Sequence, residues 1–127
     1  MPLTKIHIRK GHPPERKRAI ADAVQTSLIA TLDIPEHDRF QLIHEYEDEH
    51  FIHPEAFLDL TYTRDLLMIE IAFIAGRSDE LKQALLADLN RRLVETADVR
   101  SDDVFVSMYE FAAVNVSFGR GLTQRAP

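Results

Sequence analysis

Residues 66–76 read Leu-Leu-Met-Ile-Glu-Ile-Ala-Phe-Ile-Ala-Gly, an almost continuous apolar run that ends at a glycine. A run of this length and composition is typical of a strand that is covered on both faces. Ser78 follows as a good helix N-cap, with acidic residues in the first turn that complement the helix dipole. Leucines then recur every fourth residue, which predicts a helix as far as about Thr96. We expect a further strand over 104–110.

The first half of the chain contains the same order of elements. Weak alternation over 3–9 predicts a strand, and apolar residues at helical spacing over 15–31 predict an amphipathic helix. Residues 39–47 alternate again, as a second strand would. Between the halves, residues 48–65 have no clear period and predict a long loop with a short strand around 56–60. After 115, the glycines of the tail predict a tight turn or a short hairpin.

The two halves are related by one constant offset. Without gaps, an offset that pairs Ile6 with Ile71 gives eleven identities over a span of forty residues. The identical pairs are Ile6/Ile71, Gly11/Gly76, Glu15/Glu80, Lys17/Lys82, Ala19/Ala84, Leu28/Leu93, Thr31/Thr96, Asp33/Asp98, Asp38/Asp103, Phe40/Phe105 and Glu45/Glu110. We therefore expect a single domain over 1–127 made of two repeats, at about 2–47 and 66–111.

This duplication predicts the fold class. Each repeat is strand–helix–strand, a connection that makes parallel strands with a right-handed crossover. Two copies give an α+β fold, with a four-stranded mixed sheet and both helices on one face. The other face of the sheet would lack a cover, and self-association is the simplest way to provide one.

The composition excludes several classes of function. The net charge of −6 argues against a general nucleic-acid binder, because phosphate contacts need a basic face. The chain has no cysteine, no signal peptide and no apolar run of membrane length, so we expect a cytoplasmic protein with no membrane contact. His50 and His53 have a spacing that could hold a metal, but the segment is predicted to be a loop without a third ligand. We expect no metal and no cofactor.

The residue after the initiator is the first candidate for chemistry. Pro2 follows Met1 directly, and a small second residue allows removal of the methionine. The mature chain would then begin with a secondary amine, and an α-amino group has a reference pKa near ~8. A neighbouring cation or an apolar pocket could bring that pKa into the range of a general acid or base at neutral pH. The structural alternative is that Pro2 is simply a common second residue.

Four motifs, together with the duplication and the length of the chain, resemble those of a known family. They are Met1-Pro2-Leu3, Pro35-Glu36-His37-Asp38-Arg39-Phe40-Gln41, Ala75-Gly76-Arg77-Ser78 and Ser117-Phe118-Gly119. In order and spacing they are similar to the tautomerase superfamily, and within it to the malonate semialdehyde decarboxylase-like branch. The resemblance covers nearly the whole chain. It implies a homotrimer whose sheets form a central barrel.

The resemblance also implies roles for individual residues. Pro2 would be the acid/base group, Asp38 the carboxylate near it, and Arg77 the group that binds a substrate carboxylate. Arg39 and Phe118 would contribute to substrate binding. Each has a structural alternative: Asp38 a turn residue like its repeat partner Asp103, Arg39 and Arg77 surface arginines, and Phe118 a core side chain.

Two departures from the branch bear on the reaction. The branch has a second arginine where this chain has Ala75, and an aromatic residue where it has Val116. Both differences favour tautomerase activity on a small 2-oxo acid or its enol as the first hypothesis. A decarboxylase or hydratase of the malonate semialdehyde type is the second hypothesis, and a non-catalytic oligomeric ligand-binding module is the third.

Overall fold

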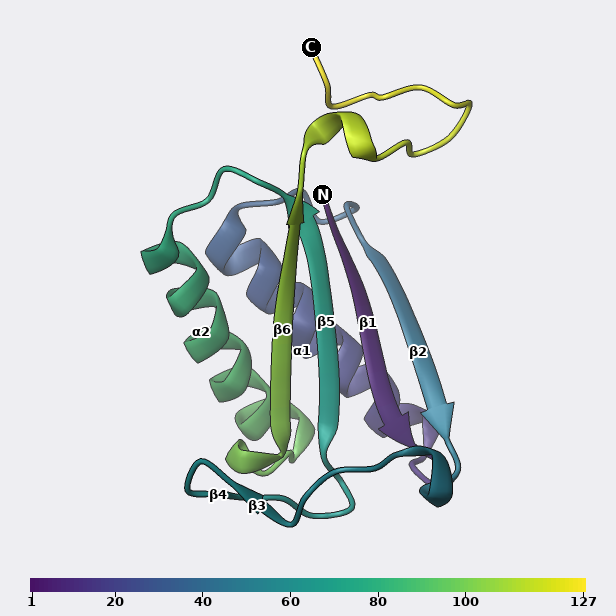
Figure 1. Ribbon diagram of the computed structural model, residues 1–127, viewed down its shortest axis with the longest axis vertical. Helices are drawn as coiled ribbons and strands as arrows, with labels where there is room; N and C mark the ends of the chain where they lie inside the picture. The colour runs from purple at the N-terminus through teal and green to yellow at the C-terminus, as the bar shows by residue number, and fades with distance from the viewer.

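A computed structural model describes residues 1–127 as a four-stranded mixed sheet with two helices packed on one face (Figure 1). The elements that build this unit are β1 (Pro2–Arg9), α1 (Pro14–Leu32), β2 (Phe40–Tyr46), β5 (Leu67–Ile74), α2 (Asp79–Ala97) and β6 (Val104–Phe111). The strand order is β2-β1-β5-β6, in which β1 is parallel to β2 and antiparallel to β5, and β5 is parallel to β6. The predicted α+β fold is confirmed.

The helix boundaries follow from local chemistry in both repeats. Proline occupies the first turn of α1, where its missing N–H is not needed, and the Ser78 hydroxyl caps α2 by accepting a hydrogen bond from the Leu81 N–H at 3.2 Å. Both helices end at an aspartate in the left-handed conformation, Asp33 and Asp98, each with φ of 55°. Equivalent residues of the two repeats therefore end equivalent helices.

The hydrophobic core lies between the helices and one face of the sheet. Alternate side chains of the two central strands point into it, and the apolar stripe of each helix covers them. The fully buried members are Ile6, Ile8, Ile20, Val24, Leu28, Leu67, Ile69, Ile71, Phe73, Leu85, Leu89 and Leu93. Truncation of such a side chain to alanine typically costs about 2–5 kcal/mol of unfolding free energy.

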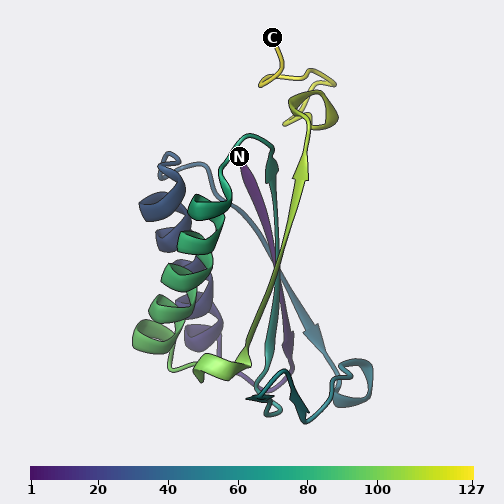
Figure 2. The same cartoon turned by 60° about the vertical axis from the view of Figure 1, so that its left-hand side comes forward.

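The opposite face of the sheet has no covering element within the chain (Figure 2). Along β5, every second side chain is buried against the helices, and the intervening ones, from Met68 to Ile74, are half-buried. The prediction that this strand is covered on both faces is therefore met on one face of the single chain. Leu42, Phe105 and Tyr109 are large side chains that remain about half-exposed on the other face.

The segment between the repeats is more structured than the sequence predicts. It begins with a short 3-10 helix, Asp48–His50, and forms a two-stranded hairpin from β3 (Ala56–Phe57) and β4 (Leu60–Thr61), where one short strand was expected. The buried Arg9 side chain holds this segment by donating hydrogen bonds to the Phe51 and Arg64 carbonyls, both at 2.7 Å.

The tail after β6 contains turns and a 3-10 helix, Ala113–Asn115, but no strand, so the turn was predicted correctly and the hairpin was not. A short 3-10 helix, Ser101–Asp103, also precedes β6. No helix of the chain combines the length and the apolar character needed to cross a membrane.

Candidate active site

Three predicted site residues lie at one end of the sheet, where β1 and β2 begin and β5 ends (Figure 1). Pro2 is the buried first residue of β1 and is paired in register with Phe73 of β5. Asp38 lies two residues before β2, and Arg77 lies in the loop between β5 and α2. The parallel and antiparallel pairings of β1 thus bring together segments that are far apart in the sequence.

The Asp38 carboxylate faces the amino terminus. Its Oδ2 atom lies 3.2 Å from the Met1 amino nitrogen, and its side chain is 9% exposed. The contact is an ion pair without hydrogen-bond alignment, so this buried oxygen accepts no hydrogen bond within the chain. The buried Gln25 amide holds the turn from below by donating a hydrogen bond to the Asp38 carbonyl at 3.0 Å. The carboxylate is therefore buried, held in place and paired only with the amino terminus.

Arg77 is available for an anion. Its guanidinium carbon lies 5.3 Å from the centre of the Phe73 ring, and Nη1 donates a hydrogen bond to the Ile74 carbonyl at 3.1 Å. No carboxylate lies within ion-pair distance of it. Gly76, with φ of 133°, provides the turn that carries this side chain out of the strand. Because Pro2 is the register partner of Phe73, the guanidinium stacks on the residue beside the candidate base.

Phe118, in the tail of the chain, lies at the same end of the sheet. Its ring centre lies 5.8 Å from that of Phe40, and both rings line a pocket with the Asp38 side chain. The other residues that line this pocket are Pro35, His37, Gln124 and Arg125. Sequence reasoning missed Gln124 and Arg125, because no motif or periodicity connects the end of the chain to the turn before β2.

Arg39 points elsewhere. Its Nη2 atom donates a hydrogen bond to the Asp22 carboxylate of α1 at 2.7 Å, and its Nε donates to the Gln41 side chain at 2.8 Å. It is not among the residues that line the Asp38 pocket. The structure therefore does not bring Arg39 together with the other predicted site residues, although it is adjacent to Asp38 in sequence.

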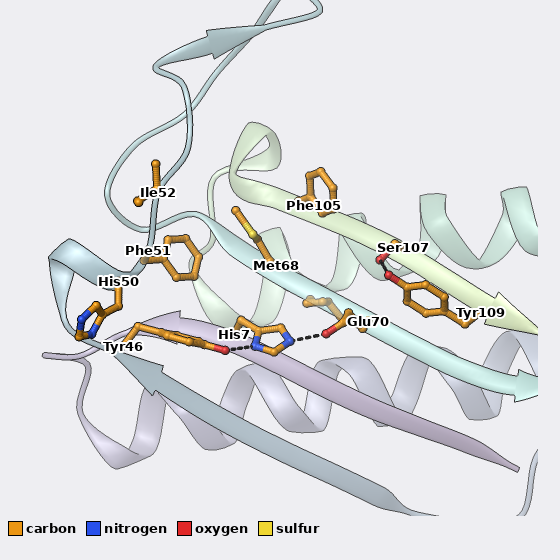
Figure 3. A pocket seen from close by; sticks show the side chains of 11 residues that line it. His7, Tyr46, His50, Phe51, Ile52, Met68, Glu70, Phe105, Ser107 and Tyr109 are labelled. Atoms are coloured by element: carbon orange, nitrogen blue, oxygen red, sulfur yellow. Dashed lines mark hydrogen bonds and ion pairs between the residues drawn. The ribbon is translucent and has the colours of Figure 1, made fainter. Parts of the chain in front are cut away.

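A second polar cluster lies in a groove on the uncovered face of the sheet (Figure 3). The His7 ring lies between the Tyr46 hydroxyl, at 2.5 Å from Nδ1, and the Glu70 carboxylate, at 2.5 Å from Nε2. The hydrogen bond from His7 lowers the pKa of Glu70. These groups satisfy one another, and the groove contains none of Pro2, Asp38 or Arg77. We therefore place the active site at the end of the sheet where β1 begins, and not in this groove.

The histidines that suggested a metal site have other surroundings. His53 Nε2 lies 3.1 Å from the Arg9 guanidinium, and its Nδ1 lies 2.8 Å from the Pro54 carbonyl oxygen. His50 lines the groove on the uncovered sheet face. No group of three or more His, Cys, Asp or Glu side chains has an arrangement that could hold a metal ion.

The fold and the site define a class: a duplicated β-α-β protein in which the amino terminus, a buried carboxylate and an arginine without a carboxylate partner lie at one end of the sheet. A family model described as "Tautomerase enzyme" matches residues 38–119, and a second model with the same description matches residues 2–57. The chain belongs to the tautomerase family of enzymes. It is 30% identical over 124 residues to the probable tautomerase YusQ of Bacillus subtilis (strain 168), a match that covers 98% of each chain.

Solved structures agree with this assignment. The chain is similar to FG41 malonate semialdehyde decarboxylase inhibited by 3-bromopropiolate, with 34% identity, a TM-score of 0.89, and coverage of 96% of this chain and 92% of that one. A fused 4-OT symmetric trimer shares the fold at 24% identity, with a TM-score of 0.77 and coverage of 94% of each chain. The family resemblance inferred from the sequence motifs is confirmed.

Proposed function

We propose that this chain, after removal of Met1, is a tautomerase that uses the Pro2 amine as general base on a small 2-oxo acid or its enol. The observation that carries the proposal is the position of the amino group, 3.2 Å from the buried Asp38 carboxylate and at the end of the sheet where Arg77 also lies. Loss of Met1 moves the amine back by one residue, about 3.8 Å along the chain, and gives it to Pro2.

The proposed reaction needs one proton carrier and one cation. The neutral Pro2 nitrogen takes a proton from the carbon next to the substrate carbonyl and delivers it to the carbonyl oxygen, which gives the enol; the reverse path gives the ketone. The Arg77 guanidinium binds the substrate carboxylate and offsets the negative charge that develops on the enolate. The Phe118 ring, beside Phe40, forms an apolar wall of the site. Arg39 would contact substrate only after leaving Asp22, so we assign the main anion-binding role to Arg77.

The charges around the amine act in opposite directions. A cationic Arg77 favours the neutral form of Pro2 and so supports a base. The Asp38 carboxylate favours the protonated form, or orders a water near the amine. Tautomerisation requires that the neutral form is well populated near neutral pH.

The Asp38 contact also favours a second candidate function. A protonated Pro2 beside a carboxylate that can activate water is the arrangement that hydration or decarboxylation of malonate semialdehyde needs. The 34% identical structure is a malonate semialdehyde decarboxylase. Carbon dioxide release from malonate semialdehyde, with Asp38→Asn as the variant that abolishes it, would favour this second function over the first.

We further propose that the active species is a homotrimer in the cytoplasm. The uncovered face of the sheet, with its half-exposed Leu42, Phe105 and Tyr109, supports self-association. The fused 4-OT structure that shares this fold is described as a trimer. In the third hypothesis, a ligand-binding module without catalysis, the same assembly would form but Pro2 would have no chemical role.

Intact mass and enol ketonisation together test the proposed function. The mass should show that Met1 is absent, and the wild-type chain should accelerate ketonisation of the phenylpyruvate enol. Replacing Pro2 with Ala should lower kcat/KM by about a hundredfold or more, because the amine acts in the proton transfer. Pro54→Ala, in the loop at the far end of the sheet, is the matched control and should keep full activity. Retained Met1, or a Pro2→Ala variant as active as the wild type, would sink the proposal.

A further inference from the structure

The buried oxygen of the Asp38 carboxylate has no hydrogen bond to hold it in place. This Oδ2 atom pairs with the amino terminus at 3.2 Å and accepts no hydrogen bond within the chain. The equivalent carboxylate in the second repeat, that of Asp103, accepts two hydrogen bonds from Thr63. The position of the Asp38 carboxylate therefore depends on the backbone of the turn that carries it.

Two contacts hold that backbone. The Asp38 N–H donates a hydrogen bond to the Pro35 carbonyl at 3.0 Å, which closes the turn. The Gln25 side chain of α1 is almost fully buried, and its Nε2 atom donates to the Asp38 carbonyl at 3.0 Å and to the Glu36 carbonyl at 3.4 Å. Because a buried amide is costly to leave unpaired, these hydrogen bonds tie the turn to the helix.

The second repeat shows what the length of the Gln25 side chain adds. The offset between the repeats pairs Gln25 with Asn90, whose Nδ2 atom donates to the carbonyl of Ser101, the equivalent of Glu36, at 2.9 Å. The amide thus bonds the same carbonyl in both repeats. In the first repeat, the additional methylene of glutamine lets the donor reach the Asp38 carbonyl as well. This additional hydrogen bond belongs to the repeat whose aspartate faces the amino terminus.

We propose that Gln25 is a positioning residue that holds the Asp38 carboxylate against the amino terminus and thereby favours the protonated amine. The inference rests on the proposed function for the identity of the amine, which belongs to Pro2 once Met1 is removed. The coupling between α1 and the carboxylate exists with or without catalysis. The hydrogen bonds of the Gln25 amide go to the turn, so its effect reaches the amine only through Asp38.

The charge of the carboxylate makes this coupling measurable. A carboxylate near an amine stabilises the protonated form, and the effect weakens as the two charges move apart. Asp38 is the only carboxylate within 4.0 Å of the amino terminus, and its burial limits screening by water and salt. A turn that loses its hydrogen bond from Gln25 can move the carboxylate away from the amine. The amine should then lose its proton at lower pH.

Gln25→Asn tests this step with the side chain that the second repeat uses. Because Asn90 serves the equivalent turn, the variant should fold and should lose only the hydrogen bond to the Asp38 carbonyl. The amine is titrated by NMR with 15N-labelled proline, or with 15N-labelled methionine if intact mass shows that Met1 is retained. We expect its titration midpoint to move to lower pH by about half the shift that Asp38→Asn causes.

Two further variants separate positioning from packing. Gln25→Met keeps the volume of the side chain but has no donor, so it should move the midpoint at least as far as Gln25→Asn. Asn90→Leu is the matched control, because it removes the equivalent amide from the other repeat, and it should leave the midpoint at the wild-type value. In an Asp38→Asn background, Gln25→Asn should cause no further shift, because the two residues act through one carboxylate.

An unchanged midpoint in the Gln25 variants, an equal shift in Asn90→Leu, or a further shift in the double variant would each overturn the inference. An unfolded Gln25→Asn variant would also overturn it, because Gln25 would then hold the fold and not the carboxylate. Failure of the proposed function is distinguishable. It would appear as enol ketonisation that is absent or independent of Pro2, whereas the inference is read from the titration of the amine alone.

Discussion

The two repeats use the same aspartate in two different ways. Asp103 is fully buried, and its carboxylate accepts hydrogen bonds from the Thr63 N–H at 2.9 Å and the Thr63 hydroxyl at 2.5 Å, with Arg100 at 3.3 Å. Asp38, its equivalent in the first repeat, has no such partners and faces the amino group of the chain. The aspartate of this turn is therefore bonded to Thr63 and Arg100 in the second repeat and paired with the amino terminus in the first.

A second pair of equivalent positions differs in the same sense. Gly11 and Gly76 have the same left-handed conformation, but His12 follows the first and Arg77 the second. Partial burial of the His12 ring lowers its pKa, and its Nε2 atom lies 3.6 Å from the Asp65 carboxylate. Arg77 has no carboxylate partner. One end of the sheet thus has an aspartate bonded to Thr63 and Arg100, and the opposite end has an aspartate whose only partner is the amino terminus, together with an arginine that has no carboxylate partner.

This difference explains how a duplicated scaffold can carry a single site. The residues of the two repeats agree in the core and at the helix ends, and the contacts of equivalent residues differ at the two ends of the sheet. The structural alternative for Asp38, a turn residue like Asp103, predicts the same hydrogen-bond partners in both repeats, and the partners differ. Substitutions at equivalent positions should therefore affect stability at one end of the sheet and activity at the other end.

The largest contrast is expected for the two aspartates. Asp103→Asn should lower the free energy of unfolding by about 2–3 kcal/mol, because it disrupts buried hydrogen bonds to a charged group. Asp38→Asn should leave stability near that of the wild type and move the pH profile of enol ketonisation to lower pH, because loss of the carboxylate favours the neutral Pro2 amine. Urea unfolding and the ketonisation assay at several pH values on both variants measure the contrast. If Asp38→Asn were the more destabilised variant and left the pH profile unchanged, the two turns would be equivalent.

The next contrast concerns the residues after the two glycines. Arg77→Gln should raise KM for a 2-oxo acid by about tenfold or more, because it removes a charge-assisted contact with the substrate carboxylate. His12→Gln, at the opposite end of the sheet, should leave kcat and KM unchanged. Steady-state kinetics on both variants checks this prediction. Similar losses in the two variants would mean that Arg77 acts through the fold and not through the substrate.

A smaller difference is expected between the helices. Burial raises the pKa of Asp88, but hydrogen bonds from Arg92, Ser27 and Arg91 outweigh it and leave the pKa below its ordinary value. A lowered folded-state pKa adds stability above the ordinary value of about 4, and this stability is lost as the pH falls through the folded-state value. The first repeat has Ala23 at this position.

Asp88→Asn should therefore lower the unfolding free energy by about 1 kcal/mol at pH 7. The difference from the wild type should shrink as the pH is lowered below 4, the range in which the wild-type carboxylate becomes protonated. Thermal unfolding followed between pH 7 and pH 3 measures it. A difference that stayed constant over this range would mean that the Asp88 charge does not hold the two helices together.

The smallest effect is expected where the repeats are alike. Lys17 pairs with Glu45 at 2.6 Å, and the equivalent Lys82 pairs with Glu110 at 2.5 Å, both between a helix and an edge strand. Exposed ion pairs of this kind contribute little, so Glu45→Gln and Glu110→Gln should each change Tm by less than about 2 °C. Differential scanning calorimetry on the two variants checks this, and unequal shifts would show an asymmetry that the ion-pair geometry does not contain.

Most of the fold could be predicted from the sequence because local and global signals agree. Apolar periodicity located β5 and both helices, and Ser78 was correctly identified as a cap. The repeat predicted the parallel strand pair within each half and the mixed sheet. The hairpin over 56–61 was missed because it has no periodicity of its own and is held by contacts such as those of Arg9.

The site was predictable only in part. Pro2, Asp38 and Arg77 were named from motifs, and the strand pairing explains why they meet. The pairing of Arg39 with Asp22 could not be foreseen, because it depends on which way a side chain turns at the start of β2. That Arg125 and Asp38 line the same pocket depends on the path of the tail, for which a sequence without periodicity holds no signal.

The pKa of the Pro2 amine tests the central claim most directly. It can be measured on the processed chain by following the nitrogen resonance of 15N-labelled proline during a pH titration. A tautomerase that uses Pro2 as a base should have an amine pKa below about 7, lowered by the Arg77 charge. A value above about 8 would contradict this account, because the protonated amine would then act as an acid, as hydration or decarboxylation requires.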